Sequence, residues 1–285
     1  MSTEKLMSQI ITLALEEDIE QGDITTEALI PGNMGGRAII IAQQEGVLCG
    51  SEIARMVFLQ VDREAKVEIL AEEGQSFKKG DVILAVMGRV HSIMKGERTA
   101  LNFLSRLSGI STLTARYVDA VRDSDVDIKD TRKTYPGNRI LEKYAVYVGG
   151  GKNHRPHLAG GVIIKDTHIK ALIAKKISIK EALQKARNVL EEKKLNKLQI
   201  EIECNTLNQV EEAIQGNPDV IMLDNMSSKE MKKAVDLIPE EIEVEASGNI
   251  TLTNIKEIAS NGVDSISVGA ITHSATALDF SLSFA

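Results

Sequence analysis

The sequence predicts an α/β protein in two parts, an N-terminal α+β domain and a C-terminal α/β barrel. Two observations predict this division. Short β-prone stretches dominate residues 37–90, whereas after about residue 110 apolar strands alternate with helices, the order typical of a parallel sheet covered by helices. The 285 residues, 43% hydrophobic and 26% charged, fit one barrel-like domain or two domains and argue against disorder.

The first part begins with a helix, predicted by Leu6, Ile10 and Leu13 at helical spacing before the acidic residues 16–18. Its other predicted elements are a helix at 51–59 and strands at 37–42, at 67–70 and on both sides of a turn at 79–81. Two amphipathic helices, 97–107 and 111–122, then mark a domain boundary near residue 110.

The second part repeats the order strand, loop, helix. Its predicted strands are short and apolar and lie at 126–130, 162–165, 199–203, 220–223, 243–246 and 265–268. Ser227 with Glu230 forms a capping box, and Asn205 is expected to cap another helix. An open doubly wound sheet and a closed barrel both fit this order. Polar residues at several strand ends favour the barrel, because the carboxyl ends of its strands meet at one mouth.

Composition and charge exclude several classes of protein. The net charge of −7 argues against a protein that coats nucleic acid or an anionic membrane. No run approaches the roughly 18–20 apolar residues of a membrane span, and the N-terminus lacks the order of a signal peptide, so we expect a cytoplasmic protein. Cys49 and Cys204 lie far apart without metal-like spacing, which argues against a disulfide framework and a zinc site.

Residues 132–165 are basic despite this acidic average. Their single acid is Glu142, and their seven Lys or Arg residues are Arg132, Lys133, Arg139, Lys143, Lys152, Arg155 and Lys165. A pocket for a small, multiply charged anion is one interpretation, and a solvated charged face is the other. The glycines 149–151 and His154 favour the pocket, because they are typical of turns and close backbone approach rather than of a helix surface.

Two late loops are candidate phosphate sites. Ser247–Gly248–Asn249 and Gly269–Ala270 each follow an apolar strand and precede a predicted helix, whose first N–H groups favour a phosphate. The last loops of barrels are frequent phosphate sites, although glycine there can also serve only to tighten a turn. A P-loop and a G-x-G-x-x-G motif are absent from the sequence, which disfavours ATP or NAD binding through them.

Long segments of the chain resemble a known family. They are ERTALNFLSRLSGISTLT, DTRKTYPGNRILEKYAVYVGGGKNHR, IIKDTH, MLDNM, EASGNI and GVDSISVGAITHSA. In this order the chain closely resembles quinolinate phosphoribosyltransferase, from GDITT near Asp23 onward. The resemblance implies an N-terminal α+β sandwich domain (1–110), an incomplete α/β barrel (111–274) and a tail (about 275–285) that returns to the first domain. It also implies a homodimer or higher homo-oligomer in which the neighbouring subunit helps to cover each barrel mouth.

The resemblance implies an activity and a set of residues. The activity is the conversion of quinolinate and phosphoribosyl pyrophosphate to nicotinate mononucleotide, CO2 and pyrophosphate, with Mg²⁺ as cofactor. Quinolinate is expected to bind Arg132, Lys133, His154 and Arg155, and Arg98 of the neighbouring subunit. Lys133, Lys165, Glu203 and Asp224 are the expected catalytic residues, with the two acids on Mg²⁺ or the ribose hydroxyls. Glu201 competes with Glu203 for this role, and the two late loops, 247–249 and 269–270, are expected to hold phosphate.

The chain departs from the usual family pattern at a few positions, which are Tyr135, Asn138, Tyr147, Gly160 and Thr167. Tyr135 and Asn138 follow the DTRK segment. The pocket wall can therefore differ from that of the quinolinate enzymes, and the aromatic acid that accepts the phosphoribosyl group can differ with it. Two alternatives therefore stay open. One is a phosphoribosyltransferase of the same fold that acts on another aromatic acid, as in a branch associated with molybdenum transport. The other is a catalytically silent paralogue that binds a phosphorylated ligand.

Overall fold

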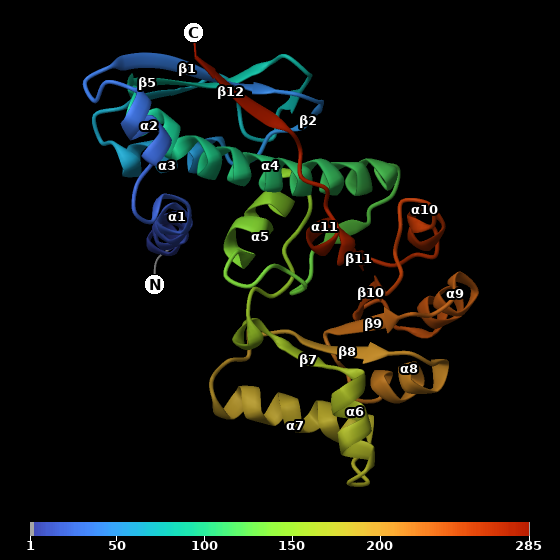
Figure 1. Cartoon of the computed structure of the whole chain (residues 1–285). Helices are drawn as coiled ribbons and strands as arrows, with labels where there is room; N and C mark the ends of the chain where they lie inside the picture. Colours follow the sequence, from blue (N-terminus) through green and yellow to red (C-terminus); the bar gives the residue numbers. More distant parts are fainter. Residues whose placement is uncertain (1–2, 285) are drawn as a thin grey trace. The chain divides into compact units, whose positions relative to one another are not determined.

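The computed structural model describes residues 3–284, and the chain forms two compact units (Figure 1). The first unit comprises residues up to 115, 134–150 and those from 271 on. The second comprises 116–133 and 151–270. The boundary expected near residue 110 falls inside one helix, and the segment 134–150, which the sequence assigned to the barrel, groups with the first unit.

The first unit is built on an antiparallel sheet in the order β12-β1-β5-β3. These strands are β1 (Gly35–Ala42), β3 (Lys66–Ile69), β5 (Val82–Arg89) and β12 (Phe280–Phe284). β2 (Gly46–Val47) and β4 (Ser76–Phe77) form a separate pair. β4 and β5 are the two strands expected around the turn at 79–81, but they do not pair with each other.

The helices of the first unit correct two expectations. They are α1 (Thr3–Ile19), α2 (Ile24–Leu29), α3 (Ser51–Val61), α4 (Val90–Ala120, partly in the second unit) and α5 (Arg139–Val148), followed by α11 (Ala270–His273) at the return to this unit. In α1 the residues that reach the core are Ile11 and Leu15, whereas Leu13 is exposed, so the predicted apolar face was rotated.

The two helices expected at 97–107 and 111–122 form one helix, α4. Ser108 and Gly109 lie between the two predicted segments. In the structure the buried Ser108 hydroxyl accepts the N–H of Cys49 over 3.0 Å, and a Cβ at Gly109 would overlap the carbonyl oxygen of Thr276. These small residues therefore permit close packing and do not end the helix.

The second unit contains a six-stranded parallel sheet in the order β6-β11-β10-β9-β8-β7. All its strands match the predicted ones: β6 (Asp127–Lys129), β7 (Val162–Ile164), β8 (Ile200–Cys204), β9 (Val220–Asp224), β10 (Glu243–Ser247) and β11 (Ser265–Ser267). β6 and β7 are the two edges, as in a barrel that is not fully closed. Parallel pairing brings all six carboxyl ends to one side.

Helices follow the strands of this sheet (Figure 1). They are α6 (Asp166–Ile173), α7 (Ile179–Glu192), α8 (Leu207–Ile214), α9 (Ser228–Leu237) and α10 (Ile255–Ala259), with a 3₁₀ turn at Leu158–Gly160. The capping box of Ser227 and Glu230 is confirmed. Asn205 does not cap α8, because Thr206 does, and the Asn205 side chain bonds Asp224 instead.

Within residues 3–284 no helix has the length and apolar character of a membrane span. Cys49 and Cys204 are buried and free, and burial raises the pKa of Cys204 to about 12. Both thiols are packing residues at neutral pH.

Candidate active site

The carboxyl ends of the parallel strands surround a cavity of about 480 Å³ in the second unit. Each of the six strands supplies a side chain at its end or just beyond it. Those predicted as site residues are Arg132, Lys133, His154, Arg155, Lys165, Glu203, Asp224, Ser247, Gly248 and Asn249. We call this space the strand-end cavity.

Some predicted residues lie elsewhere. Gly269 and Ala270 follow β11 but are not among the lining residues, whereas Ser267, the last residue of β11 and two positions before Gly269, is. Arg98 is an exposed residue of α4 in the first unit. Thr131, Asn225 and Ser267 also line the cavity. Thr131 and Asn225 were expected at strand ends but were given no role, and Ser267 was not considered. Its place at the end of β11 would have indicated it, as the same position indicated Ser247.

The Arg155 side chain gives the cavity positive charge at a fixed place. Its Nη1 donates to the carbonyl oxygens of Gly161, over 2.7 Å, and Leu158, over 3.4 Å. Burial and the nearby Arg132 guanidinium lower the pKa of Arg155, and Glu201 and Glu203 oppose this. Two guanidinium groups held close together repel each other, and an anion between them relieves that repulsion.

Lys165 and Glu203 form an ion pair among the residues that line the cavity. Lys165 Nζ lies 2.5 Å from Glu203 Oε1, and Glu203 Oε2 accepts the N–H of Asp166 over 3.3 Å. Asp224 lies one strand further on, where two asparagine amides donate to its Oδ2. The cavity therefore holds fixed cations and fixed carboxylates on neighbouring strand ends.

Glu201 lies deeper in the sheet than Glu203 and has a different partner. Its Oε2 is 3.1 Å from His154 Nε2, and Oε1 of the fully buried Glu245 is 3.6 Å from the same nitrogen. Lys129 completes this buried cluster, with Nζ 3.0 Å from Glu245 and 2.6 Å from Glu243. Glu203, and not Glu201, is the glutamate of β8 that lines the strand-end cavity.

The protonation of His154 determines whether this cluster can bind a metal ion. Burial alone would lower the pKa of His154, but the two glutamates outweigh it and raise the pKa to about 9. The backbone N–H of Arg155 points at Nδ1 over 2.8 Å, which favours a neutral ring. Both states carry a proton on Nε2, directed at Glu201. His154, Glu201 and Glu245 lie close enough to ligate a metal, but that proton makes them a hydrogen-bonded cluster.

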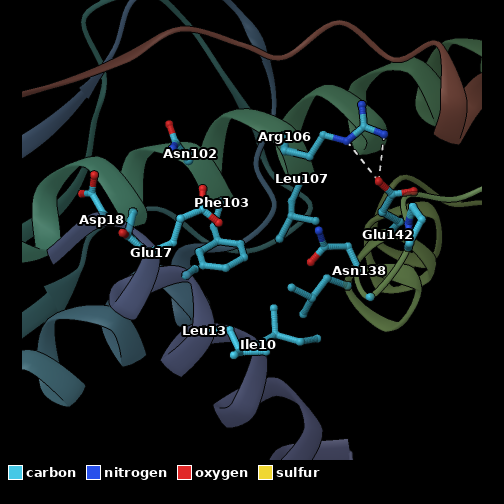
Figure 2. A pocket seen from close by; sticks show the side chains of 15 residues that line it. Ile10, Leu13, Glu17, Asp18, Asn102, Phe103, Arg106, Leu107, Asn138 and Glu142 are labelled. Atoms are coloured by element: carbon cyan, nitrogen blue, oxygen red, sulfur yellow. Dashed lines mark hydrogen bonds and ion pairs between the residues drawn. The ribbon is translucent and has the colours of Figure 1, made fainter. Parts of the chain in front are cut away.

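A second cavity, of about 390 Å³, lies within the first unit (Figure 2). Figure 2 shows Ile10, Leu13 and Phe103 on its apolar side and the pair Arg106–Glu142 at one end. Asn138 is one of its lining residues, but none of the predicted site residues lines it.

The departures from the family pattern lie outside the strand-end cavity. The Tyr135 ring stacks on Arg106, with 4.5 Å between the guanidinium carbon and the ring centroid, and Asn138 precedes α5. Tyr147 is exposed on α5, Gly160 belongs to the 3₁₀ turn, and Thr167 lies in α6. None of the five is among the residues that line the strand-end cavity.

Comparisons with known proteins agree over nearly the whole chain. The family model described as quinolinate phosphoribosyl transferase, C-terminal domain, matches residues 110–283, and the N-terminal domain model matches residues 23–108. A protein of Synechocystis sp., named probable nicotinate-nucleotide pyrophosphorylase (carboxylating), is 42% identical over 94% of this chain and 89% of its own length. Quinolinate phosphoribosyltransferase (decarboxylating) 1b of Nicotiana tabacum is 40% identical over 96% and 81%.

Solved structures give the same result. The nicotinate-nucleotide pyrophosphorylase of Ehrlichia chaffeensis aligns with a TM-score of 0.90 at 38% identity, covering 100% of this chain and 99% of its own. NadC of Streptococcus pyogenes aligns with a TM-score of 0.92 at 36% identity, with the same coverage.

Proposed function

The chain belongs to the quinolinate phosphoribosyltransferase family, and we propose that its strand-end cavity transfers the phosphoribosyl group of phosphoribosyl pyrophosphate to quinolinate. The products are nicotinate mononucleotide, pyrophosphate and CO2. One observation carries the proposal: basic and acidic side chains from neighbouring strand ends line a single cavity of about 480 Å³. Substrates with two carboxylates, a phosphate and a pyrophosphate need many fixed charges of this kind.

In this proposal the basic residues of the cavity bind quinolinate. Arg132 and Arg155 each offer a planar fork of N–H donors that matches a carboxylate, and Lys133 adds a third positive charge. His154 is also assigned to quinolinate by the family pattern. Both of its ring nitrogens already have protein partners. An indirect role therefore fits its geometry better than direct contact with quinolinate: His154 accepts the backbone N–H of Arg155 and so helps to position that arginine.

The acidic residues bind the phosphoribosyl donor. Glu203 and Asp224 offer hard oxygen ligands, which fit Mg²⁺ because this ion prefers oxygen and keeps several waters beside phosphates. When bound, Mg²⁺ would neutralise charge on the leaving pyrophosphate. Lys165, Ser247, Gly248 and Asn249 also line the cavity and are assigned to the phosphate groups, together with Gly269 and Ala270 beyond β11.

The chemistry then rests on positioning and electrostatics. The pyridine nitrogen attacks the anomeric carbon as pyrophosphate leaves, and carboxylates near the ribose stabilise the positive charge that develops on the sugar. After transfer, the ring nitrogen is positively charged. That charge stabilises the carbanion left at the adjacent carbon when CO2 departs, so decarboxylation needs no further cofactor. A proton from water then takes the place of the carboxylate on that carbon.

The test is product formation from the two substrates. With quinolinate, phosphoribosyl pyrophosphate and Mg²⁺, we expect CO2 and pyrophosphate in equal amounts, and no CO2 when nicotinate replaces quinolinate. Lys165→Ala is the negative control. Pyrophosphate release with a different aromatic acid, and none with quinolinate, would assign the chain to another acceptor. Ligand binding without any product would make it a silent paralogue.

We propose further that the site is completed by a second copy of this chain. Arg98 is exposed on α4 and does not line the strand-end cavity, and the family pattern assigns it to the partner subunit's quinolinate. Mixing Arg98→Ala chains with Lys165→Ala chains should restore part of the activity, because one site of each mixed dimer is then intact. Mixed dimers without recovery would rule out a shared site. Homodimers of either variant serve as controls.

A further inference from the structure

Asparagine side chains connect the ends of β8, β9 and β10 around Asp224. Asn205, just after β8, donates from Nδ2 to Asp224 Oδ2 over 3.2 Å and to the Asp224 carbonyl oxygen over 3.0 Å. Asn225 donates from its own Nδ2 to the same Oδ2 over 2.7 Å. Both amides bind one carboxylate oxygen, and among residues 3–284 the other oxygen, Oδ1, has no hydrogen-bond partner.

The opposite end of the Asn225 amide reaches the next strand. Its Oδ1 accepts a hydrogen bond from Asn249 Nδ2 over 2.9 Å, and its backbone N–H donates to the Ser247 carbonyl over 3.0 Å. A Cβ at Gly248 would overlap Asn225 Oδ1, so only glycine allows this approach. Asn225 is thus bonded to both Asp224 and the Ser247–Gly248–Asn249 loop.

The backbone of Asn225 holds its side chain in this place. Its φ of 56° lies in the left-handed region, which asparagine tolerates better than most residues. Gly248 and Asn249 are also left-handed, with φ of 86° and 52°. The left-handed turns after β9 and β10 thus place the Asn225 amide between the two strand ends.

We propose that Asn225 is a positioning residue for the phosphoribosyl donor. It orients the Asp224 carboxylate with Oδ1 left for the donor or its Mg²⁺, and it holds the phosphate loop at a fixed spacing from that carboxylate. The proposal rests on the proposed function, which assigns Asp224 and Ser247–Asn249 to the donor. Neutral amides suit this task, because they fix the carboxylate without cancelling its charge, in contrast to Lys165 beside Glu203.

Two substitutions separate the side chain from the backbone. Asn225→Asp keeps the size and the acceptor for Asn249 but replaces the donor facing Asp224 with a second carboxylate. Asn225→Gly removes both bonds and keeps the left-handed backbone. Asn217 is a matched control, because it is also left-handed, with φ of 49°, and exposed, but does not line the strand-end cavity.

The measurements are the KM values of both substrates, the Mg²⁺ requirement, and the rise in melting temperature that phosphoribosyl pyrophosphate with Mg²⁺ causes without turnover. Asn225→Asp should raise the donor KM about tenfold or more, as expected for hydrogen bonds to a charged group, and reduce the donor-induced thermal shift. The quinolinate KM should stay within about twofold, as should all values for Asn217→Asp and Asn217→Gly.

A double-mutant cycle decides whether Asn225 acts through Asp224. In an Asp224→Asn chain, Asn225→Gly should add little to the loss of donor affinity. Fully additive effects, or a lower melting temperature with an unchanged donor KM, would overturn the proposal and leave Asn225 a structural residue. Asn205→Ala is the alternative if the Asn225 variants do not fold. The Asn205 side chain donates to Asp224, and its backbone is not left-handed. This substitution should raise the donor KM by a smaller factor. If Asp224→Asn itself leaves donor binding intact, the proposed function fails at that residue, and this proposal fails with it.

Discussion

Arg106 in the first unit and Arg155 in the second are surrounded in opposite ways. The Arg106 guanidinium donates to Glu142, 2.8 Å away, and to the carbonyl oxygens of Thr272 and Ala275, and its face is covered by Tyr135. Arg155 donates to two carbonyl oxygens only, and within residues 3–284 it has no ion pair. Both arginines are partly buried, so burial alone does not distinguish them.

The surroundings of the two arginines distinguish a charge that stabilises the fold from a charge that is available to a ligand. Glu142 is fully buried, and its charge is balanced inside the protein by Arg106. Among residues 3–284 Arg155 forms no ion pair, and the charges of Glu201 and Glu203 offset the effect of Arg132 on it only in part. We therefore expect changes at the Arg106 cluster to reduce stability, and changes at Arg155 to reduce substrate binding and leave stability nearly unchanged.

The strongest test of this comparison is Glu142→Leu. Removing the acid leaves the Arg106 charge without its partner, so the free energy of unfolding should fall by about 3–5 kcal/mol. Urea denaturation followed by circular dichroism, at one fixed protein concentration, measures the loss. Glu142→Gln, which keeps a hydrogen-bond acceptor, should lose less. A loss under about 1 kcal/mol for Glu142→Leu would show that this pair does not stabilise the first unit.

Arg132→Ala and Arg155→Ala test the other side of the comparison. Each should weaken quinolinate binding by about 1.5–3 kcal/mol, or roughly 10- to 150-fold, because a charge-assisted contact is lost. The melting temperature should stay close to that of the unaltered protein. Arg122→Ala is the control, since Arg122 is an exposed arginine of the second unit outside the cavity. Quinolinate titration by calorimetry that finds unchanged affinity in either variant would remove that arginine from the site.

Low pH should weaken another balanced ion pair of the first unit, that of Asp62 with Arg89. Arg89 and Ser92 bond its carboxylate and hold the pKa of Asp62 at about 2, below its ordinary value of 3.8. A lowered pKa in the folded state contributes stability above pH 3.8 that is lost as the pH falls toward 2. The contribution is about 1–2 kcal/mol, since Arg89 is solvent-exposed. Thermal unfolding between pH 5 and pH 2 should therefore show a smaller acid-induced loss in Asp62→Asn, and an equal loss would contradict the assignment.

The smallest expected effect is that of Tyr135→Thr, which removes the ring stacked on Arg106. Losing the stacked ring should cost about 0.5–1 kcal/mol of stability. The quinolinate KM should not change, because Tyr135 does not line the strand-end cavity. Tyr147→Thr is the control for an exposed tyrosine. A changed quinolinate KM in Tyr135→Thr alone would show that this position reaches the acceptor after all.

The sequence predicts the second unit better than the first. Each parallel strand is a short apolar run, such as 220–223, and polar residues after such runs identify the strand ends directly. In the first unit, the helix break expected between residues 107 and 111 does not occur. Ser108 and Gly109, which lie there, approach chain segments far away in sequence. Local patterns do not contain that information.

The candidate site shows the same limit. Glu201 and Glu203 lie two residues apart on one strand, so the sequence gives them the same face of the sheet. Their partners, His154 and Lys165, come from separate segments, and only the folded chain assigns one glutamate to the buried cluster and the other to the cavity. The amide contacts of Asn225 were not predicted for the same reason.

The pairing of β12 with β1 has a consequence for how this protein folds during synthesis. The bond between Gln43 and Ser281, at the end of these strands, joins residues 238 positions apart. At about 5–20 residues per second, a ribosome adds the intervening chain in roughly 12–48 seconds. Throughout that time β1 lacks its outer partner, and an unpaired edge strand readily pairs with other chains. The second unit has a shorter delay of the same kind, because β6 pairs with β11, as in Asp127 and Ser265, 138 positions apart. We therefore expect nascent chains of this protein to expose β1 for longer than β6, and chaperones that bind exposed strands to act mainly on the first unit.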